Sequence, residues 1–88
     1  MHNSTLSARR VRTAHNELAD RFEQVRALRW PLTARDQQPL YNLIRRMLGE
    51  AEGYLEVGEM AAAMQSVTVG GTALVALSVL HDLETMEH

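Results

Sequence analysis

The sequence predicts an all-α protein, a small helical bundle in which a long antiparallel helical hairpin is followed by two shorter helices. Apolar residues recur every three or four positions along the first half of the chain, and prolines and glycines interrupt this pattern at a few places. With 88 residues, of which 45% are hydrophobic, the chain fits one packed domain covering residues 1–88.

The first predicted helix runs from about Thr5 to Arg29. Its apolar residues share one face, because they are spaced like the turns of a helix. They are Val11, Ala14, Leu18, Phe22, Val25 and Leu28. Trp30-Pro31 is expected to end this helix, since the residue before a proline is pushed out of the α region.

A second apolar stripe predicts the next helix. It consists of Leu40, Ile44, Met47, Leu48, Ala51 and Leu55. Asp36 is the expected N-cap, which places Pro39 in the first turn, where its missing amide costs little. Thr33 is the competing N-cap, with Asp36 as its capping-box partner. The link from Trp30 to Asp36 is short, so we expect the two helices to be antiparallel.

The chain changes character after Gly58, where we expect a break between two helices. Residues 60–80 carry no formal charge, and Gly70-Gly71 interrupts them. We therefore expect a short helix near 59–67, a break at the two glycines, and a last helix over about 72–86. That last helix is apolar around most of its circumference, which requires burial on several sides.

Charge is strongly partitioned along the chain. All nine basic residues are arginine, and residues 1–46 carry a net charge of +5 whereas residues 47–88 carry −7. An antiparallel hairpin sets these charges at matching depths. Arg9, Arg10 and Arg12 are expected near Glu52, Glu56 and Glu59, and Glu17, Asp20 and Glu23 near Arg45 and Arg46. We expect the partition to set register inside the fold or across a homodimer, with each exposed pair worth about 0–1 kcal/mol.

Several kinds of chemistry are not indicated. The absence of cysteine excludes a disulfide framework, a thiolate zinc site and a thiol nucleophile. No Glu-x-x-His motif supplies a helical metal site, and His15 fits a histidine at the edge of the core, satisfied by one hydrogen bond. We therefore expect no enzyme activity, no metal and no cofactor. The start of the chain lacks the apolar run of a signal peptide, so we expect a cytoplasmic location.

An apolar last helix in so small a chain predicts a protein–protein interaction module of adaptor, chaperone or inhibitor type. It would complete its core with another copy of itself, as a homodimer or larger homo-oligomer, or with another protein. The candidate partner-binding residues are Met60, Met64, Leu74, Leu77 and Leu80.

Two alternatives use other features of the chain. The arginine-rich first helix predicts a nucleic-acid-binding regulator that contacts phosphates through Arg9, Arg10 and Arg12. The uncharged stretch 60–80 predicts a single membrane span, because about twenty apolar residues can cross a bilayer.

Overall fold

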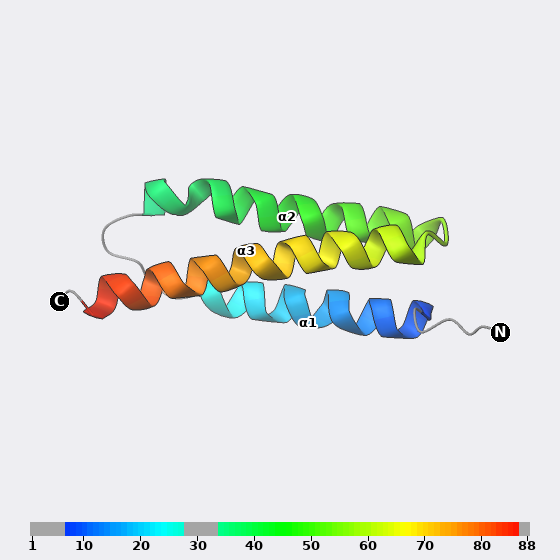
Figure 1. The fold of residues 1–88 in the computed structure, drawn as a ribbon, viewed down its shortest axis with the longest axis horizontal. Helices are drawn as coiled ribbons and strands as arrows, with labels where there is room; N and C mark the ends of the chain where they lie inside the picture. Colours follow the sequence, from blue (N-terminus) through cyan, green and yellow to red (C-terminus); the bar gives the residue numbers. More distant parts are fainter. Residues whose placement is uncertain (1–6, 28–33, 87–88) are drawn as a thin grey trace.

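The structure is a computed structural model that describes residues 7–27 and 34–86. These residues form three helices, α1 (Ala8–Ala27), α2 (Ala34–Glu56) and α3 (Met60–Met86), without strands. The predicted small all-α bundle is confirmed. Figure 1 shows the helices side by side, with α2 running antiparallel to both α1 and α3.

Ser7 begins α1 as its N-cap. Its Oγ accepts a hydrogen bond from the Arg10 amide at 3.2 Å, and its carbonyl accepts the first intrahelical bond from Val11. The described helix runs to Ala27, with Arg26 placed favourably in the last turn. The predicted stop at Trp30-Pro31 lies outside the described residues.

The expected start of α2 at Asp36 is wrong. The helix begins at Ala34, so Asp36 is already helical and Pro39 is the sixth residue rather than part of the first turn. Pro39 therefore removes the amide that would bond to the carbonyl of Arg35, and the start of α2 has one fewer hydrogen bond. Thr33, the competing N-cap, lies outside the described residues.

The predicted break at Gly58 is confirmed. Gly58 has a φ of 81°, a conformation that favours glycine. Its amide bonds to the Leu55 carbonyl at 3.3 Å, and the Glu59 amide bonds to the Tyr54 carbonyl at 2.9 Å. This pair of bonds is a Schellman motif, which closes α2 and turns the chain directly into α3.

The expected break at Gly70-Gly71 is wrong, because α3 is one continuous helix from Met60 to Met86. A Cβ added at Gly70 would lie 2.9 Å from Leu18 Cδ2 and 3.2 Å from Met47 Cβ. Gly70 thus allows α1 and α2 to approach α3 closely, and this packing offsets the cost of about 1 kcal/mol of a glycine inside a helix.

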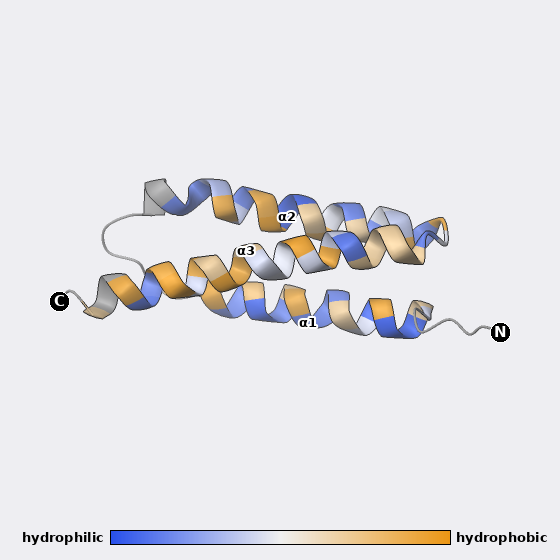
Figure 2. Cartoon of the chain, in the orientation of Figure 1, coloured by the Kyte–Doolittle hydropathy of each residue, from blue (hydrophilic) through white to orange (hydrophobic). Residues whose placement is uncertain are grey.

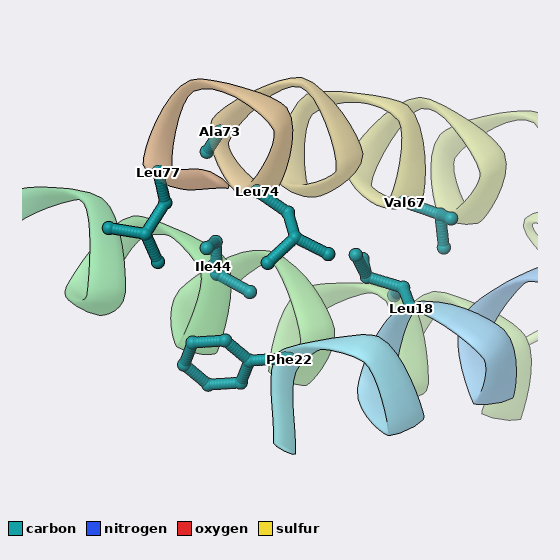
Figure 3. Packing of buried hydrophobic residues seen from close by; sticks show 8 residues of the cluster. Leu18, Phe22, Ile44, Val67, Ala73, Leu74 and Leu77 are labelled. Carbon is teal, nitrogen blue, oxygen red and sulfur yellow. The ribbon is translucent and has the colours of Figure 1, made fainter. Parts of the chain in front are cut away.

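The core lies along the line where the three helices meet (Figure 3). Its buried cluster consists of Leu18 and Phe22 from α1, Ile44 and Ala51 from α2, and Val67, Ala73, Leu74 and Leu77 from α3. The most extensive packing joins α2 to α3, and α1 covers one side of that pair. α1 and α2 are antiparallel, as expected from the sequence, and α2 packs more extensively on α3 than on α1.

Candidate functional site

The candidate site is the side of α3 that faces away from the other helices. Figure 2 shows apolar colour along most of α3, whereas α1 and α2 alternate between polar and apolar residues. One side of α3 is buried at Ala63, Ser66, Gly70, Ala73 and Leu77. The opposite side stays exposed although it carries no charge between Met60 and Leu80. Only half of this apolar helix is covered.

The exposed side carries a regular row of residues, which we call the outer seam. It consists of Gln65, Val69, Thr72, Ala76, Val79, Leu83 and Met86, all exposed. Their spacing alternates between four and three residues, which is the heptad spacing of a coiled-coil contact face. The outer seam therefore has the periodicity that a partner helix requires.

Two threonines on this side of α3 have their hydroxyl groups occupied. The Thr68 hydroxyl donates to the Met64 carbonyl at 2.8 Å, and the Thr72 hydroxyl donates to the Thr68 carbonyl at 3.1 Å. Such back-bonding satisfies the hydroxyl within its own helix. These threonines can therefore be covered by an apolar partner without losing a hydrogen bond.

A groove between α2 and α3 adjoins the outer seam. Its wider part, of about 390 Å³, is lined by Leu40, Leu43, Thr68, Val69, Thr72, Ala73 and Ala76. Its narrower part, of about 210 Å³, is lined by Met47, Glu50, Tyr54, Ala62, Gln65, Ser66 and Val69. Val69 lines both parts. The wider part contains no titratable side chain, so it offers shape and apolar surface rather than acid–base chemistry.

The residues expected to bind a partner lie in different places. Leu74 is 3% exposed and Leu77 is 0% exposed, so both belong to the core of the single chain and are not available to a partner. Met60 and Met64 are half-buried, and Leu80 is 38% exposed beside the outer seam.

Sequence reasoning overlooked Val69, Val79 and Leu83. The three- and four-residue spacing of the outer seam to which they belong was visible in the sequence, but the inner face of α3 repeats with the same spacing. Periodicity alone therefore could not tell which of the two rows is covered.

A polar cluster fixes α1 against α2 near Glu52. Arg12 Nη1 lies 2.7 Å and 3.0 Å from the two carboxylate oxygens of Glu52. His15 Nε2 lies 3.1 Å from the Leu48 carbonyl and 3.5 Å from Glu52 Oε1. The expected pairing of Arg12 with Glu52 and the place of His15 at the edge of the core are confirmed. Arg12 and Glu52 are nearly half exposed, so their ion pair is worth about 0–1 kcal/mol.

The second level of expected ion pairs is wrong. Glu23 pairs with Arg26 of its own helix at 2.7 Å. Among the described side chains, neither Glu17 nor Asp20 forms an ion pair with Arg45 or Arg46. The reason is geometric, because the contact between α1 and α2 is the least extensive of the three helix pairs and an i,i+3 partner is always within reach.

The candidates for nucleic-acid contact lie near the start of α1, and one of them is paired with a carboxylate. Arg9 and Arg10 are exposed near the start of α1, whereas Arg12 is engaged by Glu52. The carboxylate of Glu52 therefore neutralises part of the positive charge on which phosphate binding depends.

An aromatic contact joins α1 to α2 towards the other end of the bundle. The rings of Phe22 and Tyr41 lie 5.9 Å apart at an angle of 50°, and the Arg26 guanidinium lies 5.8 Å from the centre of the Phe22 ring. Burial raises the pKa of Tyr41 above its ordinary value of 10.0, and the nearby charge of Arg26 partly opposes this shift.

Two further observations bear on the chemistry of the chain. In the part of the chain that the structure describes, no three histidine, aspartate or glutamate side chains are grouped to hold a metal ion. The segment Met60–Leu83 of α3 is long and apolar enough to cross a membrane, and 39% of its most apolar window is buried inside the bundle. By length and composition alone, the core helix of a water-soluble bundle has the same properties.

Comparison of this chain with known protein families, with curated proteins and with solved structures finds no significant match to any of them.

Proposed function

We propose that this protein is a small non-enzymatic interaction module that binds a helical protein surface through the outer seam of α3. The observation that carries the proposal is the uneven burial of α3. Its inner side packs on α1 and α2, while Val69, Val79 and Leu83 of the outer seam are each about half exposed. A contiguous apolar surface of this kind on a small domain commonly marks a protein contact.

The shape of the surface supports a helix as the bound element. The outer seam has heptad spacing, and the groove beside it is lined by small side chains and leucines. An amphipathic helix that lies in such a groove presents its apolar residues at the same spacing. Adaptors, chaperones and inhibitors all use this mode of binding, and the surface suits each of these roles.

Cross-linking inside cells tests the proposal. A photo-activatable residue at Val79 is expected to form covalent adducts with a polypeptide, whether another copy of the chain or a different protein. The matched control carries the same residue at Val57, which is 71% exposed in the α2–α3 turn and lies off the outer seam. Equal polypeptide adducts from both positions, or none from Val79, would contradict the proposal. Adducts formed with lipid alone would instead support a membrane-spanning α3.

A further inference from the structure

We propose that the partner of the outer seam is a second copy of this chain, bound antiparallel through α3 so that two α2–α3 hairpins form a four-helix bundle. This inference rests on the proposed function, because it names the partner of the same surface. It commits to one orientation and one register, and both can be tested.

The residues of the outer seam complement themselves when one copy is turned end for end. Around a twofold axis, if residue i faces residue j, then j also faces i. One register brings a large side chain opposite a smaller one at every level. Its pairs are Val79 with Ala76, Leu83 with Thr72, and Met86 with Val69. Such alternation gives the interlocking side-chain packing of coiled coils.

The neighbouring register is less favourable. A shift by one heptad places Leu83 opposite Gln65 and leaves the small residues Ala76 and Thr72 facing each other. The first contact would cover a polar amide with a leucine, and the second would leave a gap. Side-chain size and polarity therefore favour the first register over this one.

The groove explains why α2 takes part as well. Leu40 and Leu43 line it opposite Thr72 and Ala76, which belong to the outer seam. A second α3 on the seam therefore lies over these leucines and covers them too. The two hairpins then form a square of four helices, with α1 outside the new contact on each copy.

The shape of the single chain agrees with lateral pairing. Its extents are 54 × 19 × 16 Å, and its radius of gyration is 14.8 Å. A compact protein of this length has a radius of gyration of about 12 Å. In so elongated a bundle, one whole side of each helix is exposed to solvent. A second copy that packs lengthwise along α3 covers the exposed apolar side of that helix.

The mass of the full chain in solution tests the pairing. Light scattering in detergent-free buffer is expected to give twice the mass of the chain. Val79→Glu should raise the dimer dissociation constant about thirtyfold or more, because it buries an unpaired charge at the centre of the contact. Val57→Glu adds the same charge outside the contact and should leave the mass unchanged. Circular dichroism checks that both variants stay helical.

Cysteine cross-linking tests the orientation, and the absence of native cysteine makes the result unambiguous. Thr72→Cys mixed with Leu83→Cys should form a disulfide-linked dimer containing one copy of each. Neither variant alone should cross-link, because identical positions lie about 16 Å apart along the axis in this register. Gln24→Cys on the exposed side of α1 controls for random collision. Efficient cross-linking of Leu83→Cys alone would show a parallel dimer and overturn the proposal.

The outcomes separate this inference from the proposed function. A monomeric wild-type chain, or a dimer that survives Val79→Glu, overturns the second-copy proposal. If Val79 still forms adducts with a different protein in cells, the proposed function holds although the second-copy proposal fails. If the chain instead floats with phosphatidylcholine vesicles, both proposals fail and α3 acts in a membrane.

Discussion

Two helices of this bundle pack against α2, and they differ in what they leave outside. α1 buries one stripe at Val11, Leu18 and Phe22 and covers the rest of its circumference with charged and polar residues. α3 buries a comparable stripe but presents uncharged residues on its other side as well. The polar outer side of α1 is well solvated by water, whereas burial of the uncharged outer side of α3 against another surface would stabilise it.

The two helices also differ in how they are attached. α1 is fixed to α2 partly through the polar cluster of Arg12, His15 and Glu52. α3 is attached through close apolar packing, with glycine at its nearest approach. A helix can therefore be essential to the core on one side and remain exposed to solvent on the other. Three predictions test this comparison, beginning with the largest expected effect.

Truncation on the two sides of α3 should have very different costs. Leu77→Ala should lower the free energy of unfolding by about 2–5 kcal/mol, because it opens a cavity in the core. Val75→Ala, on the exposed side, should change it by less than about 0.5 kcal/mol. Urea unfolding followed by circular dichroism measures both. Equal costs would contradict the assignment of inner and outer sides.

The adjacent glycines provide a matched pair within α3. Alanine at either position gains the same helix propensity of about 1 kcal/mol, but only at Gly70 does the new Cβ meet Leu18 and Met47. We expect Gly70→Ala to be less stable than Gly71→Ala by about 1–3 kcal/mol, the usual cost of overpacking. Thermal unfolding of the two variants side by side measures the difference. Equal stabilities would show that α1 does not approach α3 as closely as described.

The smallest effect concerns the α1–α2 side and depends on pH. Folding raises the pKa of Tyr41, so the folded state holds the phenol proton more tightly than the unfolded chain. The resulting stabilisation is complete below pH 10 and is lost as the pH rises through the raised pKa.

This prediction can be checked cleanly because the chain contains neither lysine nor cysteine, which would titrate in the same range. In a Tyr54→Phe background, Tyr41 is the remaining tyrosine, and its ionisation can be followed by absorbance near 295 nm. Half-ionisation at or below pH 10 in the folded protein would refute the raised pKa. Adding Tyr41→Phe should remove the corresponding fall in stability above pH 10.

Much of the fold could be predicted from particular residues. The apolar stripes of α1 and α2 and the turn at Gly58 are local patterns, fixed by helix geometry and by the backbone freedom of glycine. The pairing of Arg12 with Glu52 followed from antiparallel register alone. The failed predictions at Asp36 and at Gly70-Gly71 concern helix ends and interruptions, where local preferences are worth only about 1 kcal/mol and packing overrides them.

The candidate site could be predicted only in part. The sequence by itself determined that the last helix is apolar around its circumference and that this requires extensive burial. Which side of α3 is buried within the single chain depends on where α1 and α2 lie, and only the tertiary structure sets their positions. Tertiary packing therefore placed Leu74 and Leu77 in the core and left Val79 and Leu83 outside. The physical reason is that two neighbouring helices can cover only about half of the surface of a third helix.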